Sequence, residues 1–401
     1  MKEIINKLYQ IFLFGCIFLC FSCGEESLPP INAEFGADNV LILEGEPVSF
    51  TDASSGEPDK WTWEFEGGNP ITSNNQNPII TYETSGTYSV SLTSSNKDNS
   101  DEITKSDFIV VIKEVTTLFS VNDSTIDEGE QVIFEDLSIS ATSWEWQFDG
   151  GNPESSNEQN PTIIYNQSGI FEVTLTTSNQ ASSNSLRKTE YIFVRPTEGL
   201  VAHYPFNGNA DDESGNNLNG TVVEATLTQD RNDNISAYYF DGINDRIVVD
   251  NNTLFENQQF TISAWFIAEK DTGTVISLSV PPSGSNNSGY NVAIIDGFPR
   301  GTSNISSGMW AVALSDTPTS LNEWHHIVFT YDGVTLVLYL DNEAIVDLEQ
   351  PHLVNYNEHN PINIGTYATK GGGTWFTGKL DDIRIYNRAL SVTENYTLFV
   401  E

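Results

Sequence analysis

The residues of this chain that could do acid–base chemistry are its 56 Asp and Glu and its five His. Hydrolysis of a glycosidic bond with retention uses two carboxylates about 5 Å apart, which a β-strand presents when acidic residues alternate along it. Between residues 197 and 401, no strand-like run has that alternation. Asp341-Asn342-Glu343 comes closest, but it falls where a hairpin turn is expected, so its side chains should point into solvent.

The adjacent His325 and His326 are a second candidate, as a pair of metal ligands. Neighbouring residues of a strand face opposite sides of the sheet, so we expect one structural and one exposed histidine. The chain has no G-x-S-x-G turn of the kind that presents a nucleophilic serine, although composition leaves a Ser/His/Asp arrangement open. The sequence therefore predicts no catalytic residue.

Three aromatic residues are predicted to contact a ligand. Trp375 and Phe376 follow a run of three glycines, and Trp310 is the third. An aromatic ring can stack on the apolar C–H face of a sugar while Asn or Asp side chains bond its hydroxyls. Trp310 and Phe376 suit core positions equally well, so the interpretation has an alternative for both.

The composition excludes some partners and predicts several domains. The formal net charge is −39, with only 17 Lys and Arg, and such a surface repels phosphate backbones, so nucleic acid is not an expected partner. Hydrophobic residues make up 38% and aromatics 11% of the chain, which is enough for folded cores. A chain of 401 residues exceeds one typical core, so we expect more than one domain.

Residues 1–23 have the pattern of a secretory signal. The apolar run at 11–21 follows basic residues and is too short to span a bilayer as a stable helix. All three cysteines lie in this segment, at Cys16, Cys20 and Cys23. The rest of the chain therefore has no disulfide, no zinc–thiolate site and no Cys nucleophile.

The stretch Leu-Cys-Phe-Ser-Cys-Gly at 19–24 resembles the lipobox of bacterial lipoproteins, of the loose type found in Bacteroidetes. The two glutamates after it are similar to an acidic export tag. The resemblance implies that Cys23 is lipidated and that acyl chains hold the protein in the outer membrane, on the cell surface. The alternative is an ordinary cleaved signal peptide with an incidental cysteine.

Two stretches of the chain are copies of one unit. Trp61-Thr-Trp63-Glu-Phe65 returns as Trp144-Glu-Trp146-Gln-Phe148, and further Tyr and Gly pairs keep the same spacing. Alternating apolar residues in runs such as 87–93 and 170–176 predict half-buried strands, and Gly-Gly-Asn-Pro turns interrupt them. About seven strands in roughly 80 residues predict an immunoglobulin-like sandwich for each copy.

The W-x-W-x-F core, the Asn-Pro turn and the Tyr-x-x-x-Gly-x-Tyr segment resemble the polycystic kidney disease (PKD) domain. The resemblance places PKD-like domains at 32–115 and 116–196, after a linker at 24–31, and implies extracellular spacer or adhesion modules. Trp63 and Trp146 could stack on sugars. Each occupies an inward position of an alternating strand, however, and we expect both in the domain cores.

From 197 to 401 the pattern predicts a larger all-β domain, a two-sheet jelly roll, because many strand-like runs occur and none has an extended 3.6-residue period. Four signatures resemble the concanavalin A-like lectin/glucanase superfamily, in particular its laminin G-like subgroup. They lie at 204–209, 240–242, 324–332 and 378–391. The resemblance implies binding of glycans or protein partners on one concave sheet or its rim loops.

Calcium is the metal that this domain favours, because Ca²⁺ takes carboxylate and carbonyl oxygens. Asp211 and Asp212 lie in a Gly- and Asn-rich stretch, and in similar sandwiches that segment and the one with Asp382 come together near the two ends of the domain. The three aspartates are the predicted ligands of a structural calcium ion. The alternative is a solvated acidic loop in a very acidic protein.

We therefore predict an all-β chain, with two immunoglobulin-like (PKD-type) sandwiches followed by a concanavalin A-like jelly-roll sandwich. The predicted function is non-catalytic. A lipid anchor holds the protein to the membrane, the PKD pair is a spacer, and the last domain binds polysaccharide or glycoprotein glycans. The alternatives are a diverged glycoside hydrolase and a protein-binding adhesin.

Overall fold

The computed structural model describes residues 27–278, 288–306, 309–356, 360–367 and 374–400. It is all-β, with 55% of residues in strands and 3% in helices, which confirms the predicted fold class. None of the helices in these described ranges is long and apolar enough to cross a membrane. The chain divides into two compact units, the first consisting mainly of residues up to Thr116 and the second of most of the remainder.

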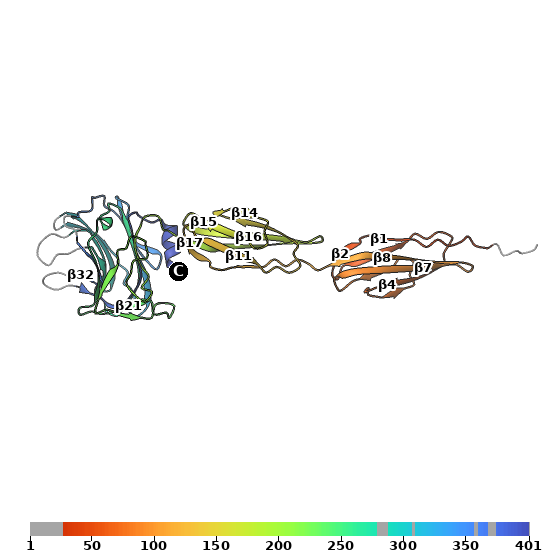
Figure 1. The fold of residues 1–401 in the computed structure, drawn as a ribbon, viewed down its shortest axis with the longest axis horizontal. Helices are drawn as coiled ribbons and strands as arrows, with labels where there is room; N and C mark the ends of the chain where they lie inside the picture. Colours follow the sequence, from red (N-terminus) through yellow and green to blue (C-terminus); the bar gives the residue numbers. More distant parts are fainter. Residues whose placement is uncertain (1–26, 279–287, 307–308, 357–359, 368–373, 401) are drawn as a thin grey trace, which may run out of the picture. The chain divides into compact units, whose positions relative to one another are not determined.

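The first unit contains a small sandwich (Figure 1). One sheet has the strand order β1 (Phe35–Ala37), β3 (Pro47–Asp52), β6 (Ile79–Thr81), and the other has the order β2 (Leu41–Leu43), β8 (Ser100–Ile112), β7 (Gly86–Ser95), β4 (Lys60–Phe65), β5 (Thr72–Ser73). Trp63 is fully buried between them and donates its indole N–H to the carbonyl of Asn75 at 2.9 Å. Its prediction as a core residue is confirmed.

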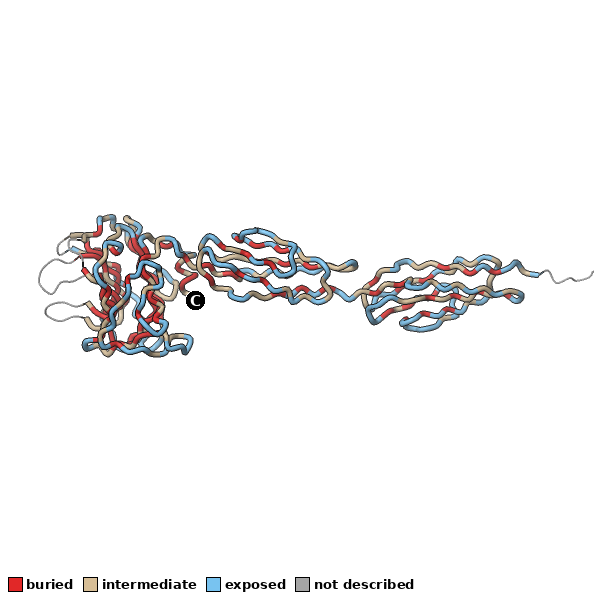
Figure 2. The backbone as a smooth tube through the Cα atoms, viewed as in Figure 1, coloured by how far each residue is buried: buried red, intermediate tan, exposed pale blue. Residues whose placement is uncertain are grey.

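The second sandwich repeats this architecture. One sheet has the order β13 (Gly151–Asn152), β15 (Thr162–Tyr165), β11 (Gln131–Asp136), β9 (Phe119–Val121), and the other has the order β10 (Thr125–Asp127), β17 (Ser183–Arg195), β16 (Gly169–Ser178), β12 (Ser143–Phe148), β14 (Ser155–Ser156). Trp146 is buried like Trp63 and donates to the carbonyl of Glu158 at 3.0 Å. Figure 2 shows buried and exposed residues alternating along these strands, as a period of two requires.

The C-terminal domain is a larger sandwich of two sheets. The eight-stranded sheet has the order β20 (Thr226–Thr228), β21 (Ala237–Asp241), β34 (Thr377–Tyr386), β23 (Phe260–Ala268), β28 (Trp324–Tyr331), β29 (Thr335–Leu340), β30 (Glu343–Glu349), and β18 (Leu200–Tyr204) also pairs with β34. The seven-stranded sheet has the order β19 (Gly220–Val223), β22 (Arg246–Val249), β31 (Ile362–Ile364), β24 (Gly273–Ser277), β25 (Tyr290–Ile295), β26 (Phe298–Ser306), β27 (Met309–Leu314).

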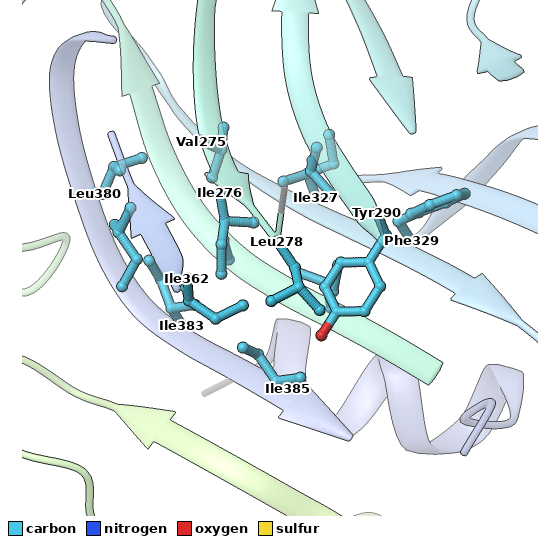
Figure 3. Packing of buried hydrophobic residues seen from close by; sticks show 14 of the residues in the cluster. Val275, Ile276, Leu278, Tyr290, Ile327, Phe329, Ile362, Leu380, Ile383 and Ile385 are labelled. Atoms are coloured by element: carbon cyan, nitrogen blue, oxygen red, sulfur yellow. The ribbon is translucent and has the colours of Figure 1, made fainter. Parts of the chain in front are cut away.

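The core of this domain lies between the two sheets, where every second residue of each strand points inward. Ile276 comes from the seven-stranded sheet, and Ile327 and Ile383 come from the eight-stranded sheet (Figure 3). All three are fully buried. Because one face of each sheet is used in this way, the residues that alternate with the core residues project from the two outer faces.

One helix was not expected from the sequence. Helix α1 (Val392–Phe399) begins with a capping box, in which the Ser391 hydroxyl accepts from the backbone N–H of Glu394 and the Glu394 carboxylate accepts from the N–H of Ser391. Phe399, in its last turn, stacks on Trp265 of the eight-stranded sheet, with ring centroids 5.8 Å apart. The S-x-x-E spacing was the signal that could have predicted this helix.

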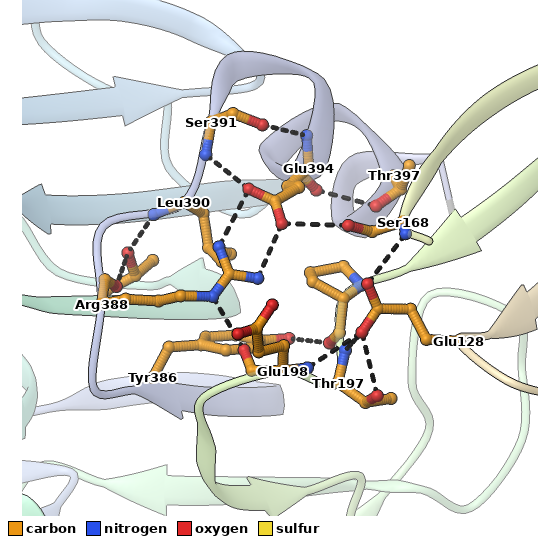
Figure 4. Close-up of polar contacts among 12 residues, drawn as sticks. Glu128, Ser168, Thr197, Glu198, Tyr386, Arg388, Leu390, Ser391, Glu394 and Thr397 are labelled. Atoms are coloured by element: carbon orange, nitrogen blue, oxygen red, sulfur yellow. Dashed lines mark hydrogen bonds and ion pairs between the residues drawn. The ribbon is translucent and has the colours of Figure 1, made fainter. Parts of the chain in front are cut away.

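The second sandwich and the C-terminal domain are joined by hydrogen bonds within the second unit (Figure 4). The Glu128 carboxylate accepts from the backbone N–H groups of Ser168, Thr197 and Glu198 at 2.8, 2.8 and 2.9 Å. The Ser168 hydroxyl donates to Glu394 of helix α1 at 3.0 Å, and Glu394 is paired with Arg388 at 2.7 Å. Helix α1 therefore contacts both a neighbouring domain and the sheet of its own domain.

Candidate functional site

A cavity of about 260 Å³ lies on the outer face of the seven-stranded sheet. Alternate residues of β25 form its floor. Val292 and Ile294 point into the core, and the residues between and beside them face the cavity, namely Asn291, Ala293 and Ile295. Polar, aromatic and apolar side chains from six strands surround it, namely Thr274, Asn291, Ala293, Ile295, Arg300, Thr302, Trp310, Tyr367 and Thr374.

The register of the sheet brings these residues together. Thr274 of β24 lies opposite Ala293 of β25, which lies opposite Arg300 of β26, so the three form one row across the sheet. Asn291 and Thr302 are opposite each other in the next outward row. Between the two outward residues of β26, Gly301 faces the core, where an added Cβ would come within 2.4 Å of the Phe329 ring. A glycine at this position allows β26 to pack closely against the core.

A small hairpin forms one wall of the cavity. Strand β32 (Thr366–Tyr367) pairs with β33 (Thr374–Trp375), with Tyr367 opposite Thr374. The Thr374 hydroxyl is hydrogen-bonded to that of Thr274 at 2.5 Å, which fastens the hairpin to the sheet. The aromatic ring of Tyr367 is thereby held at the rim, and Trp310 of β27 also lines the cavity.

Two polar groups of the cavity have no hydrogen-bond partner among the described residues. The Nε atom of Arg300 and the Oγ1 atom of Thr302 are both buried and unpaired, and Thr302 is only 2% exposed. Buried polar groups are normally hydrogen-bonded, and leaving one unpaired costs about 1–3 kcal/mol. Both groups therefore lack the partner that buried polar groups normally have.

Comparison with protein families identifies the family of this domain and of the two sandwiches that precede it. Residues 241–394 match the concanavalin A-like lectin/glucanases superfamily, and residues 29–111 and 118–190 each match the PKD domain. The chain contains two PKD domains and one concanavalin A-like domain. The resemblances read from the sequence motifs are thus confirmed for all three domains.

Individual proteins match only parts of the chain. Collagenase ColA of Clostridium perfringens is 29% identical over 143 residues, which are 35% of this chain and 11% of that protein. Among solved structures, domain 4 of AbnA, a GH43 extracellular arabinanase from Geobacillus stearothermophilus, in complex with arabinotriose, has a TM-score of 0.42 at 20% identity, covering 50% of this chain and 98% of that one. The binding domain of Paraclostridial Mosquitocidal Protein 1 has a TM-score of 0.42 at 21% identity, covering 51% and 52%.

The structure separates the three aromatic residues that the sequence singled out. Trp310 lines the cavity of the concanavalin A-like domain. Trp375 is half-buried next to the lining residue Thr374 but is not itself part of the lining. Phe376 is 1% exposed and packs in the core against Phe240, so its prediction as a ligand contact is wrong. Phe376 lies between β33 and β34, where the chain passes from the hairpin to the eight-stranded sheet.

The three predicted calcium ligands of the concanavalin A-like domain do not form a cluster of oxygen ligands. The Asp382 carboxylate is bonded to His203 at 2.9 Å and to Arg384 at 2.8 Å. Asp212 accepts backbone N–H groups of its own loop and of His203, and Asp211 is exposed. Within the described ranges, no group of three or more His, Cys, Asp or Glu side chains could hold a metal ion. The calcium ion itself stays a prediction.

Asp382 belongs instead to a buried charge cluster on the outer face of the eight-stranded sheet. Arg231 pairs with Asp381 at 2.6 Å, and its guanidinium lies 4.7 Å from the centre of the Trp265 ring. Burial opposes ionisation of Asp382, yet Arg384 and His203 hold its pKa well below the usual value. At Asp381, burial and the neighbouring Asp382 raise the pKa.

The adjacent histidines face opposite sides of the sheet, but neither is exposed. His326 lies on the outer face, 1% exposed, against Trp265 and Phe399, and burial lowers its pKa to about 3. His325 is 9% exposed and contacts Phe266. The expectation of one exposed histidine is wrong because Phe399 of helix α1 covers the position that faces outward.

Asp341 is also not the solvent-directed turn residue that was expected. Its carboxylate accepts from His325 Nδ1 at 2.8 Å and from the backbone N–H of His326 at 2.9 Å, because the turn folds back on β28. Ser320 Oγ is 2.8 Å from His325 Nε2 and donates to Glu323 at 2.7 Å. The hydrogen bond with Asp341 raises the pKa of His325. This row of residues ties the 315–323 loop to the sheet.

Each PKD domain has a groove of its own, at corresponding places in the two copies. The groove of the first domain has a volume of about 510 Å³ and includes Glu64, Glu66 and Ser91. That of the second has a volume of about 560 Å³ and includes Asp149 and Glu172. Both are larger than the cavity of the concanavalin A-like domain. Neither contains an unpaired buried polar side chain in the described structure, so we place the candidate site in the concanavalin A-like domain.

Proposed function

We propose that the concanavalin A-like domain binds a saccharide in the cavity on its seven-stranded sheet and that it does so without cleaving it. One observation carries the proposal: a cavity with aromatic side chains on its walls contains two buried polar groups that no described residue satisfies. A sugar has both an apolar C–H face for stacking and hydroxyls for hydrogen bonds.

The size of the cavity suits a small part of a glycan. Its volume of about 260 Å³ lies just below the roughly 300–1,000 Å³ of pockets that hold drug-sized ligands. A single sugar unit or the end of a chain is therefore the expected occupant. Trp310 would stack on the ring, and Asn291 and Thr302 would bond its hydroxyls.

Binding is favoured over hydrolysis by the side chains around the cavity. Glycoside hydrolysis commonly uses a pair of Asp or Glu residues that flank the bond, and the described lining residues include neither. Asp381 and Asp382, two adjacent buried aspartates, are paired with arginines on the other sheet. The hydrolase alternative therefore has no carboxylate pair at this cavity to support it.

The remaining domains would present the saccharide-binding domain at the cell surface. In this proposal the two PKD domains are spacers and Cys23, which lies outside the described residues, carries the lipid anchor in the outer membrane. Labelled palmitate should be incorporated into the wild-type protein and not into a Cys23→Ala variant. Equal labelling of both proteins would remove the anchor from the proposal and leave the saccharide site unaffected.

A panel of polysaccharides and glycoproteins, titrated against the full chain, tests the binding site. Trp310→Ala should weaken binding about tenfold or more, because the stacking surface is lost. Trp375→Ala is the matched control, since this neighbouring tryptophan does not line the cavity, and should bind like the wild type. Binding to a glycoprotein that survives enzymatic removal of its glycans would favour a protein-binding adhesin instead. Release of new reducing ends would show hydrolysis.

A further inference from the structure

Arg300 differs from the other arginines of the chain in having no partner. Five arginines form ion pairs with carboxylates, and a sixth, Arg246, donates to the carbonyl of Asn244; the five are Arg187, Arg195, Arg231, Arg384 and Arg388. The side chain of Arg300 makes no ion pair and no hydrogen bond with any residue that the structure describes, and its Nε atom is buried.

An unpaired arginine is unexpected in this protein. The chain has 56 acidic residues and 17 basic ones, so carboxylates are available for nearly every cation. Arg300 is half-buried in a cavity whose described lining contains no Asp or Glu. A guanidinium that is partly removed from water and has no counter-charge is costly, and an anionic ligand would supply both the charge and the hydrogen-bond acceptors.

The neighbouring residues add geometry to the charge. Arg300 and Thr302 are alternate residues of β26, so their side chains project from the same face of the sheet. The buried Thr302 hydroxyl is the second unpaired group, and Trp310 and Tyr367 are the rings beside them. An anionic oxygen could accept from both Arg300 and Thr302 while the sugar ring that carries it lies against an aromatic side chain.

We infer that the saccharide bound in this cavity is acidic and that Arg300 recognises its anionic group. This inference rests on the proposed saccharide binding. The group is a carboxylate, as in a uronic or sialic acid, or a sulfate ester, because both present the paired oxygens that a guanidinium binds in a bidentate way. The guanidinium presents its N–H donors in a planar fork. Arg300 is therefore the residue that distinguishes acidic from neutral sugars.

Calorimetric titration of the full chain with paired probes tests the inference. Galacturonate, glucuronate and sialyl oligosaccharides are each compared with their carboxyl-reduced counterparts, and a sulfated galactan is compared with its desulfated form. At least one acidic probe should bind ten- to a hundredfold more tightly than its neutral counterpart, as expected for a charge-assisted bidentate contact. Which pair shows the preference identifies carboxylate or sulfate.

Variants of the arginine assign the preference to the site. Arg300→Gln should bind acidic and neutral probes equally, and Arg300→Lys should keep part of the preference, because lysine retains the charge but not the planar fork. Arg246→Gln makes the same change of charge on β22 of the same sheet, outside the cavity lining, and should leave the preference unchanged. Melting temperatures check that each variant is folded.

The outcomes separate this inference from the proposal beneath it. If neutral and acidic probes bind the wild type equally, or if both Arg300 variants keep the full preference, the role of Arg300 is wrong. Saccharide binding at the cavity would still stand in that case if Trp310→Ala weakened it. If no probe binds the wild type, both the saccharide proposal and the acidic-sugar inference are overturned.

Discussion

The two outer faces of the concanavalin A-like domain differ in whether their buried or half-buried arginines are paired with carboxylates. On the eight-stranded sheet, Arg231 and Arg384 are paired with Asp381 and Asp382, and helix α1 covers part of the face. On the seven-stranded sheet, Arg300 has no carboxylate among the described residues. The arginines on the eight-stranded sheet therefore have partners within the protein. In our proposal, Arg300 on the seven-stranded sheet takes its partner from a ligand.

Unpaired atoms alone would not have made this distinction. Nε1 of Trp265 and Nδ1 of His326 also lack hydrogen-bond partners on the covered face. These two atoms, however, belong to uncharged rings that pack against each other and against Phe399. Nε of Arg231 lacks a hydrogen-bond partner as well, but its guanidinium is paired with Asp381. The difference teaches that an unsatisfied group indicates a ligand site when it lies at a cavity and has no counter-charge within the protein. Where aromatic packing has already closed the space, it indicates only a cost of packing.

The largest effect is expected from breaking a charge pair on the covered face. Asp382→Asn would remove the carboxylate that pairs with Arg384, which is 3% exposed, and would weaken the bond to His203. We expect the free energy of unfolding to fall by about 3–5 kcal/mol, as for other buried ion pairs that lose one partner. Urea denaturation of the full chain measures it.

The control for that variant is Asp211→Asn, which removes the same charge from an exposed position. It should change the unfolding free energy by less than about 0.5 kcal/mol. Similar losses for the two variants would mean that the Asp382 pair has no special role, and the contrast between the faces would disappear.

The next effect is a pH dependence that originates at His326. The folded protein keeps this residue neutral because burial lowers its pKa to about 3, from an ordinary 6.5. At pH 5 the unfolded chain binds a proton that the folded chain does not, so this contribution to stability is present above pH 6.5 and is lost as the pH falls toward 3. The loss is at most about 1.4 kcal/mol for each pH unit.

A His326→Gln variant isolates this contribution, because other titrating groups are common to both proteins. The difference in unfolding free energy between wild type and variant should shrink as the pH is lowered from 6.5. A difference that stays constant over this range would show that His326 is accessible to protons in the folded state, in conflict with its cover by Phe399.

The smallest effect is expected on the face with the cavity. Thr302→Val replaces an unpaired buried hydroxyl by a methyl group of similar shape, so no hydrogen bond within the described structure is lost. The unfolding free energy should stay within about 0.5 kcal/mol of the wild type or rise slightly. Thermal denaturation can measure it, and a loss above about 1 kcal/mol would show that the hydroxyl has a partner in the folded protein.

Much of the fold could be predicted because each strand carries its own signal. The alternation in β7 and β16 and the repeated Trp-x-Trp-x-Phe motif predicted both PKD sandwiches and the buried positions of Trp63 and Trp146. Helix α1 was missed because its eight residues are too few for a clear 3.6-residue period, and only the S-x-x-E capping box indicated it. The helix in turn explains why the exposed histidine was predicted wrongly.

The candidate site was predictable only in part, and for a different reason. Trp310 was selected from the sequence by its residue type, whereas Arg300 and Thr302 carry no local signal that distinguishes them from other residues of a strand. Phe376 was misassigned because its inward direction depends on how the chain passes from β33 to β34 in the assembled domain. The side chains around the cavity come from six strands, between Thr274 and Thr374, and no short motif spans that distance.

By itself, the sequence determined which residues form strands and which of two faces each side chain takes, because a period of two is a local property of the chain. Only the tertiary structure decided which residues meet across strands. Register and sheet order bring Asp382 to Arg384 and His203 on one face and leave Arg300 beside Thr302 and Trp310 on the other. Pairing of a charge depends on such distant neighbours, so the difference between a structural cluster and a candidate binding site appears only when the sheets are assembled.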